Sequence, residues 1–294
     1  MLFEPVNSQS WMMADVQSSL YVCLSGIWVT GNETLAGDVR NNAMAERDAS
    51  QTPSANSWKL WTAGIVLTGA VLRFWHLGYH ALWLDEAATY RRITHKIPFF
   101  FENIAVNDSH PPGYYLVVWF WARMANFTSG TSTHLESLLR LPSAFLGILL
   151  ILFCCGMDRQ LKPDRKFPLG GLLVALSVMC IYFSQEARHY ILYAMLCMGG
   201  TLALSWQVKG NARSWICWLA YVVAMTLGMY TFYYSAFFLL GHGIFWCVHK
   251  WREKRDMVRG GLLICLPGVL FLPYVPVVLQ LKSRLNQAQA PMVY

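Results

Sequence analysis

The chain has 294 residues, of which 55% are hydrophobic and only 13% are charged. Because soluble proteins carry about 25% charged residues, this composition excludes an ordinary soluble domain and predicts a membrane protein. The net charge is +7, but many basic residues gather in short clusters at 159–166, 209–213 and 250–259, between apolar runs. Such clusters set membrane topology and meet anionic lipid, so a nucleic-acid partner is not predicted.

Residues 1–58 differ in composition from the rest of the chain, with polar residues scattered from Gly31 to Ser57. Their one apolar run, Leu20 to Val29, is too short to cross about 30 Å of hydrocarbon. It is also a poor signal peptide, since no Lys or Arg precedes Arg40. We therefore expect residues 1–58 to be a flexible leader and residues 59–294 to form a membrane domain.

Apolar runs follow one another after this leader, at 60–78, 111–127, 139–156, 167–183, 190–207, 213–229, 231–249 and 260–281. Most are near the twenty residues that a helix needs to span a bilayer. Hydrocarbon requires backbone groups to be satisfied within each segment, and the alternation of a barrel is missing. The sequence thus predicts an all-α, polytopic transmembrane bundle of about eight apolar helices. Seven of the eight cysteines lie inside these runs and none forms a C-x-x-C spacing, so a disulfide framework is not predicted.

The segment from Ala81 to His110 combines aromatic and basic residues, which suits an amphipathic interfacial helix after the first apolar helix. The basic cluster at 250–259 should lie in the cytoplasm, and counting back from it places Glu186 outside. Asp85 and His110 would then fall inside unless one early run fails to cross. That run is either 111–127 or 139–156, and we expect the first, because two prolines and a glycine open it and an arginine lies within it.

Two adjacent carboxylates, Asp85 and Glu86, follow the first run. On a helix, neighbouring side chains diverge by about 100 degrees, so one can point into a site while the other is held elsewhere. A carboxylate at a water–lipid boundary suits a general base that takes a proton from a hydroxyl. The alternative is a charge pair at a helix N-terminus on a wet loop.

A second cluster, Gln185 to Tyr190, contains a cation, a carboxylate and a phenol. Arg188 can fork onto phosphate oxygens, while Glu186 can orient it or bind a sugar hydroxyl. The alternative is an interfacial Arg beside a Tyr of the aromatic belt. His110, which the next proline holds out of the helical region, is either an acid/base or phosphate contact or a structural residue. The aromatic residues from Tyr230 to Phe238 either line a lipid-chain groove or form an interface belt with bundle packing.

Four motifs stand in order along the chain: Leu84-Asp85-Glu86-Ala87, His110-Pro111-Pro112-Gly113-Tyr114-Tyr115, Arg140-Leu141-Pro142-Ser143-Ala144 and Gln185-Glu186-Ala187-Arg188-His189-Tyr190. Together they resemble the bacterial branch of glycosyltransferase family 39, which includes the dolichyl-phosphate-mannose protein mannosyltransferases. The resemblance covers about residues 60–280 and implies a membrane bundle of the GT-C fold.

The resemblance implies inverting transfer of a sugar from a polyprenyl-phosphate-linked donor to a protein, lipid or glycan hydroxyl on the outer face of the membrane. Asp85 would be the catalytic base, with Glu86 supporting it. The donor phosphate would meet Arg188 first, then His110 and Arg140. The other candidates, which would shape the sugar and acceptor pocket, are Glu186, His189, Tyr190, Asp108 and Tyr114.

The implied location is the plasma membrane, as a multi-pass protein of a bacterial inner membrane. A cofactor is not predicted, although Asp85, Asp108 and Glu186 could share a divalent cation if they met. Relatives usually have several more helices, so a truncated or non-catalytic subunit is one alternative. A transporter is another, since charges within a membrane mark transport paths, but here they cluster at helix mouths. The paired broken segments that carriers show in two halves are also missing.

Overall fold

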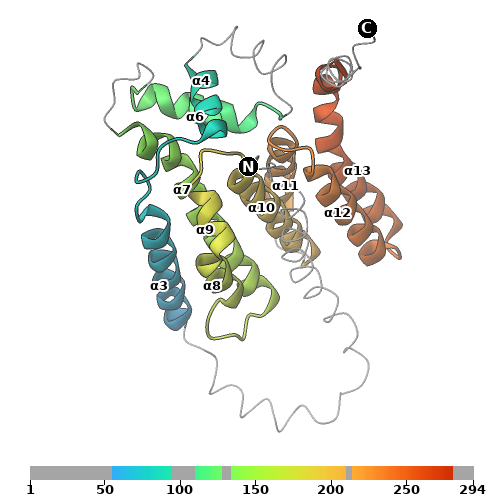
Figure 1. Ribbon diagram of the computed structural model, residues 1–294. Coiled ribbons are helices and arrows are strands. Elements are labelled where there is room, and N and C mark those ends of the chain that lie inside the picture. The colour runs from blue at the N-terminus through green and yellow to red at the C-terminus, as the bar shows by residue number, and fades with distance from the viewer. Residues whose placement is uncertain (1–54, 95–109, 128–133, 210–213, 281–294) are drawn as a thin grey trace, which may run out of the picture. The chain divides into compact units, whose positions relative to one another are not determined.

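The computed structural model describes residues 55–94, 110–127, 134–209 and 214–280 (Figure 1). Residues 1–54 of the predicted leader, Asp108 and the second half of the predicted interfacial segment lie outside the described residues. Within the described ranges every regular element is a helix, which confirms the predicted all-α class. The GT-C type and the count of about eight apolar helices stay predictions.

The described residues form ten α-helices and one 3-10 turn. They are α3 (Ala55–Phe74), α4 (Leu84–Ile93), α6 (Gly113–Met124), α7 (Leu135–Leu161), α8 (Leu169–Leu176), α9 (Val178–Ser184), α10 (Tyr190–Val208), α11 (Ser214–Met229), α12 (Ser235–Lys250), α13 (Lys254–Phe271) and η2 (Leu272–Tyr274). Three segments are long and apolar enough to cross a membrane: Leu135–Leu161, Tyr190–Val208 and Lys254–Gln280. This supports the prediction of a membrane protein.

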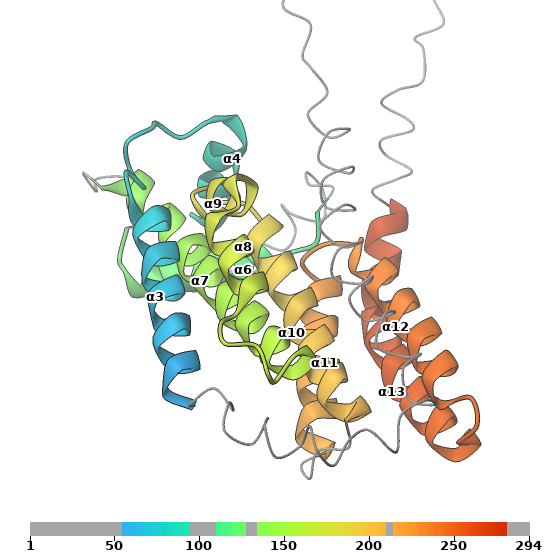
Figure 2. The same ribbon diagram turned by 90° about the horizontal axis from the view of Figure 1, so that it is seen from below.

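α7 and α10 form the centre of the bundle. α10 packs against α7 and α11, while α7 also packs against α3 and α8. In both ribbon views α3 lies on one side of this centre and the α12–α13 pair on the other (Figures 1 and 2). Small residues allow the close approach: a Cβ added at Gly171 of α8 would collide with Cys155 of α7. Such contacts matter in a membrane because helix association there depends on tight packing rather than on exclusion of water.

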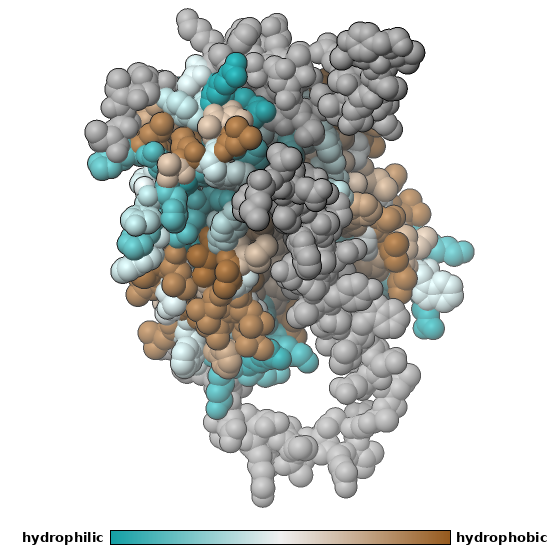
Figure 3. Space-filling model, viewed as in Figure 1, coloured by the Kyte–Doolittle hydropathy of each residue, from teal (hydrophilic) through white to brown (hydrophobic). Residues whose placement is uncertain are grey.

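The basic clusters and the predicted site lie at opposite ends of the long helices. At one end Lys209, after α10, donates to the carbonyl oxygen of Gln160 in α7. At the same end the Arg159 guanidinium lies 5.3 Å from the centre of the Trp58 ring in α3. At the other end of α3, the segment 185–189 contacts its last turn. Hydropathy is distributed accordingly, with brown apolar side chains over the helices and teal polar ones towards their ends (Figure 3).

α6, the core of the predicted run 111–127, stays at the site end of the bundle. Its first residue, Gly113, donates its backbone N–H to Tyr230 O at 2.7 Å, at the end of α11. Near its last turn, Trp121 Nε1 donates to Leu138 O at 2.7 Å, in the first turn of α7. With 12 residues α6 is only about 18 Å long, against about 30 Å of hydrocarbon. In Figure 1 it runs across the direction of α3 and α7, which supports the prediction that this run does not cross.

The predicted run 167–183 is broken in two at Ser177, which adopts an extended conformation between α8 and α9. The Ser177 hydroxyl accepts from the backbone N–H of Cys180 and caps α9. The carbonyl oxygens at the end of α8, which the break leaves without helical partners, accept hydrogen bonds from Arg73 of α3. Its guanidinium donates to Val174 O at 3.1 Å and to Ala175 O at 3.2 Å. A side chain of a neighbouring helix therefore satisfies the backbone that the break exposes.

The other end of α8 is capped in the opposite sense. Asp158 of α7 accepts the backbone N–H of Gly171 at 3.0 Å, in the first turn of α8. A carboxylate thus stands at the N-terminus of this short helix and a guanidinium, Arg73, at its C-terminus. Both charges complement the helix dipole, so the break is stabilised by side chains from α3 and α7.

Candidate functional site

The three charged clusters of the sequence meet at one end of the bundle. The Arg188 Nη2 atom, in the turn between α9 and α10, lies 3.2 Å from Asp85 Oδ2 in the first turn of α4. The rings of His110 and His189 are 4.4 Å apart between their centres. Asp85, His110 and Arg188 therefore share one face of the protein, as the predicted site requires.

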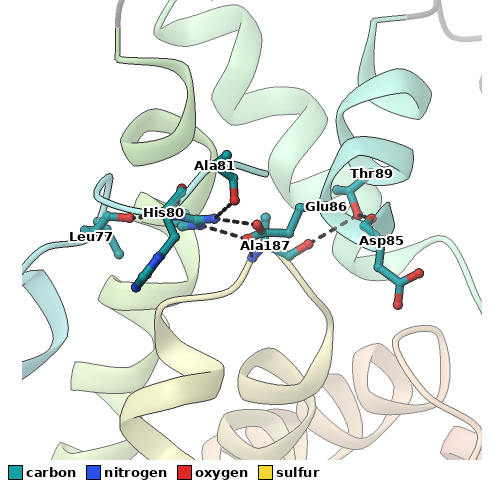
Figure 4. Close-up of polar contacts among 8 residues, drawn as sticks. Leu77, His80, Ala81, Asp85, Glu86, Thr89 and Ala187 are labelled. Atoms are coloured by element: carbon teal, nitrogen blue, oxygen red, sulfur yellow. Dashed lines mark hydrogen bonds and ion pairs between the residues drawn. The ribbon is translucent and has the colours of Figure 1, made fainter. Parts of the chain in front are cut away.

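Asp85 and Glu86 occupy opposite environments although they are adjacent. The Asp85 side chain is 41% exposed, whereas that of Glu86 is completely buried. Both lie in the first turn of α4, where the helix geometry makes neighbouring side chains diverge. Figure 4 shows the two carboxylates pointing in different directions. Of the two carboxylates, only Asp85 is partly exposed and contacts Arg188.

Arg140 of α7 holds Glu86 and is fully occupied. Its Nε and Nη2 atoms donate to the two oxygens of Glu86 at 2.8 and 2.6 Å. The other three N–H groups donate to the carbonyl oxygens of Leu77, His80 and Ala81 at 2.9–3.3 Å. A guanidinium has five N–H donors, so none is left for a phosphate. This geometry corrects the predicted phosphate contact of Arg140, which has no donor left for it. Glu86, expected to support Asp85, contacts Arg140 and the backbone N–H of Ala187. Both are positioning residues.

Ala187 is the point at which α4 holds the turn between α9 and α10. Its backbone N–H donates to Glu86 Oε1 at 2.9 Å, and its carbonyl accepts from Thr89 Oγ1 at 3.2 Å (Figure 4). Both backbone groups of one residue are thus bound by two side chains on one face of α4. The ion pair with Arg140 extends this connection to α7. The residue after Ala187 is Arg188, whose position follows from this double attachment.

Gln185 attaches the same turn to α3. Its side-chain amide donates to the carbonyl oxygens of Leu72, Arg73 and Trp75 at 2.9–3.3 Å, around the C-terminus of α3. The last carbonyl groups of a helix have no donor within the helix, and here the Gln185 amide, which is distant in the sequence, donates to them. Segment 185–189 is therefore fixed between α3 and α4, which pre-organises the guanidinium that it carries.

Arg188 is the cation of the site with donors to spare. Its side chain is 8% exposed, and no described residue accepts a hydrogen bond from its Nε. Burial lowers the pKa of the guanidinium, but the oxygens of Tyr115, Asp85 and Tyr190 offset this effect and hold it above the usual value. A permanently charged group with a single carboxylate partner and a free N–H is suited to a ligand with several acceptor oxygens.

Glu186 is a buried carboxyl group beside this pair. Burial raises its pKa, the hydrogen bond with Tyr182 opposes the rise, and the nearby charge of Glu86 adds to it. A raised pKa makes Glu186 more easily protonated than an exposed glutamate. It can therefore donate a hydrogen bond to an oxygen-rich ligand when protonated, and accept one when ionised.

Aromatic rings form one wall of the site. His189 lies 4.3 Å from Tyr190 and 4.7 Å from Phe232 between ring centres, and His110 lies 6.0 Å from Phe232 in a stacked arrangement. These rings come from three segments that are distant in the sequence: the residues before α6, the start of α10 and the turn between α11 and α12.

Two predicted pocket residues fall outside this arrangement. Tyr114 is completely buried in α6, and its hydroxyl lies 2.8 Å from the Ser143 hydroxyl of α7. It joins two helices and does not reach the site surface, so its predicted contact with a sugar or acceptor is corrected. Asp108 lies outside the described residues.

Three residues that support the site were not among the predicted site residues. Thr89 lies one helical turn after Asp85, and nothing in the sequence distinguishes it from a residue on a helix surface. Gln185 was seen as part of a motif but had no predicted role. Phe232 was noted only within an aromatic-rich segment. Each acts through a partner about 40 to 110 residues away, so spacing along the chain gave no signal for its contact.

Within the described ranges, no group of three His, Cys, Asp or Glu side chains is placed to hold a metal ion. Of the three carboxylates considered for a shared cation, Asp85 and Glu186 are described and Asp108 is not. Comparison with protein-family models, curated proteins and solved structures found no match for this chain.

Proposed function

We propose that the chain is a multi-pass membrane glycosyltransferase of the kind implied by its resemblance to family 39. It moves a sugar from a polyprenyl-phosphate-linked donor to a protein, lipid or glycan hydroxyl, with inversion at the anomeric carbon. The observation that carries the proposal is the contact between Asp85, a half-exposed carboxylate, and Arg188, a buried guanidinium with an unused N–H. A base and a phosphate-binding cation are the two groups that this transfer needs.

The proposed reaction is a single displacement. The Asp85 carboxylate takes the proton of the acceptor hydroxyl while the hydroxyl oxygen forms a bond to the anomeric carbon. The bond between that carbon and the phosphate oxygen breaks, and its electron pair leaves with the polyprenyl phosphate. Arg188 stabilises the charge that develops on this phosphate. His110, His189 and Tyr190 line the space beside the pair, with Glu186 placed to hydrogen-bond a sugar hydroxyl.

The ion pair itself suggests how the donor prepares the base. Without donor, Asp85 and Arg188 neutralise each other. A phosphate offers Arg188 a doubly hydrogen-bonded, charge-assisted partner, which competes with the single contact to Asp85. Donor binding would then release the carboxylate for the acceptor. Because Glu86 and Arg140 hold the backbone on both sides, this exchange needs only side-chain movement.

The proposed location is a bacterial inner membrane, with the site on the outer face. Its support is the separation of the two ends of the bundle: Arg159 and Lys209 lie at the end opposite to Asp85 and Arg188. Positively charged loops prefer the cytoplasm, which leaves the site outside. Transport is less well supported, because the ends of the broken helix α8 are already occupied by Asp158 and Arg73. Carriers leave such ends open to their substrate.

The test uses the full chain reconstituted in lipid vesicles with a radiolabelled polyprenyl-phosphate sugar and a mixture of hydroxyl acceptors. Transfer should be lost in Asp85→Asn and in Arg188→Gln. Asp164→Asn, which changes an exposed aspartate in the α7–α8 connection, is the matched control and should keep full transfer.

Binding of the radiolabelled polyprenyl phosphate separates the two roles. Arg188→Gln should bind it at least tenfold more weakly, as expected for losing a charged hydrogen bond of about 1.5–3 kcal/mol. Asp85→Asn should bind it as tightly as the unchanged protein or more tightly, since a competitor of the phosphate is removed. Transfer that survives Asp85→Asn would eliminate the assigned base. A chain that binds the lipid but transfers to no acceptor would favour a non-catalytic subunit.

A further inference from the structure

The hairpin between α12 and α13 carries a shallow, open apolar groove at its tip. The groove has a volume of about 440 Å³ and is lined by Cys247, Val248, Trp251 and Met257. Val248 and Trp251 are each 68% exposed, so the groove opens directly to the surroundings. Apolar side chains continue from it along both helices, including Ile244 on α12 and Leu262 on α13. The groove is therefore the end of an apolar surface that runs along the hairpin.

The hairpin is held in one arrangement by its own packing. Trp246 of α12 donates its indole N–H to Asp256 O at 3.3 Å in the first turn of α13. Gly260 lies so close to the same indole that a Cβ there would collide with it. Since the two helices are locked together next to the groove, the groove exists before any ligand arrives.

Basic residues flank the groove residues along the chain. Five Lys or Arg residues stand between positions 250 and 259, against two acidic residues. Lys250 and Glu253 pair with each other at 2.9 Å. The exposed cations beyond this pair are Arg252, Lys254, Arg255 and Arg259, with Asp256 as the remaining acid. Lys254 and Arg255 share the first turn of α13 with Asp256, and the positive end of the helix dipole repels the two cations. A bound anion would relieve this repulsion.

The hairpin tip lies at the far end of α12 from the aromatic wall of the predicted site. α12 has 16 residues, so it carries the chain about 24 Å away from the aromatic wall of the predicted site. In Figure 3, teal side chains at the tip adjoin the brown surface of α12 and α13. An exposed tryptophan at such a boundary is typical of the membrane interface.

We propose that this hairpin tip is a binding site for an anionic phospholipid. An acyl chain lies in the groove lined by Val248, Trp251 and Met257, and the headgroup phosphate contacts Lys254 and Arg255. Charge complementarity selects an anionic lipid, and the apolar groove selects a lipid over a free anion. The site lies at the other end of α12 from Asp85 and Arg188 and does not depend on the proposed transfer reaction.

The test is a titration of the purified full chain in detergent with phosphatidylglycerol or phosphatidylcholine, with bound lipid counted by native mass spectrometry. The unchanged protein should retain phosphatidylglycerol in preference to phosphatidylcholine. In Lys254→Gln/Arg255→Gln the affinity for phosphatidylglycerol should fall on the order of twentyfold, since each interfacial cation contributes about a fivefold factor. Trp251→Ser should weaken binding while leaving the charge unchanged.

The matched control is Lys162→Gln/Arg165→Gln, which removes the same charge from exposed residues of the α7–α8 connection, away from the residues that line the groove. It should keep the affinity of the unchanged protein. An equal loss in this control would mean that lipid responds to net charge alone and would overturn the proposal. Displacement of the lipid by inorganic phosphate, or equal retention of phosphatidylcholine, would overturn it as well. Thermal unfolding of each variant shows whether the hairpin is still folded.

Discussion

The connection between Glu86 and Arg140 can be tested by the substitution Glu86→Gln. Glutamine keeps the size of the side chain and an oxygen for the N–H of Ala187. It removes the negative charge, however, and turns an amide NH2 group towards one of the guanidinium donors. Arg140 would keep its three carbonyl partners and lose the carboxylate to which it is paired.

The expected cost follows from the burial of the pair. Both side chains are at most 6% exposed, so solvent cannot replace the lost partner. Removing one member of a buried ion pair costs about 3–5 kcal/mol. In a chain of this size 1 kcal/mol corresponds to roughly 2–4 °C of melting temperature, so the melting temperature should fall by about 6–20 °C.

Two measurements check this expectation on the purified protein: thermal unfolding followed by tryptophan fluorescence, and limited digestion with trypsin. Because Glu86 also holds Ala187, the turn before α10 should loosen and the bond after Arg188 should become accessible to the protease. The matched control is Glu253→Gln, which breaks an exposed pair with Lys250 and should leave both readouts unchanged. If Glu86→Gln unfolds at the temperature of the unchanged protein, the pair does not position the site.

Three further substitutions probe other contacts. Gly113→Ala would place a Cβ 2.6 Å from a backbone oxygen of the α11–α12 connection, so it should lower the melting temperature and the transfer rate. The control is Gly64→Ala, which has open space around it and should change neither. Arg73→Leu leaves carbonyls at the end of α8 without donors, at about 1–3 kcal/mol each, so thermal unfolding should start several degrees lower, unlike in exposed Arg165→Leu. Burial raises the pKa of Glu186 above its usual 4.5, so the folded state holds a proton that the unfolded chain releases, and the stability of the unchanged protein should fall as pH rises from 4.5. Glu186→Gln lacks this titrating group, so its melting temperature relative to that of the unchanged protein should rise over the same range. A difference that does not change with pH would contradict this.

The sequence predicted the helices well because each apolar run is a local property. Composition and run length sufficed for the all-α class, and the parity of the basic clusters predicts that one early run does not cross. The contacts that end α6 at Tyr230 and Leu138 could not be predicted, since they join segments far apart in the chain. The break at Ser177 was missed for a similar reason. The run has no proline after Pro168 at its start, so it reads as one helix, and the arginine that stabilises its break lies in another helix.

The site was predicted as a set of residue types, but their division of labour was not. The sequence predicts that Asp85 and Arg188 share one face because their residue types suit the same chemistry, and the two side chains are in contact. Glu86, Arg140 and Tyr114 carry equally suitable groups, and only burial and partners distinguish them from residues that reach a ligand. Spacing along the chain cannot supply this information. A guanidinium whose donors are all satisfied has the same letter as one with an unused donor.

The two ion pairs at this end of the bundle differ in the property that matters for function. The Glu86–Arg140 pair is buried and every donor of the arginine is occupied, so any change of partner would leave a charge or a carbonyl unsatisfied. The Asp85–Arg188 pair is half-exposed on the acid side and has an unused donor on the basic side, so a ligand can replace one partner at little cost. The Glu86–Arg140 pair, with every donor occupied, thus fixes the backbone that carries the Asp85–Arg188 pair, in which one donor is unused. Because Ala187 links them, mutations in the first pair should impair the second without touching any substrate.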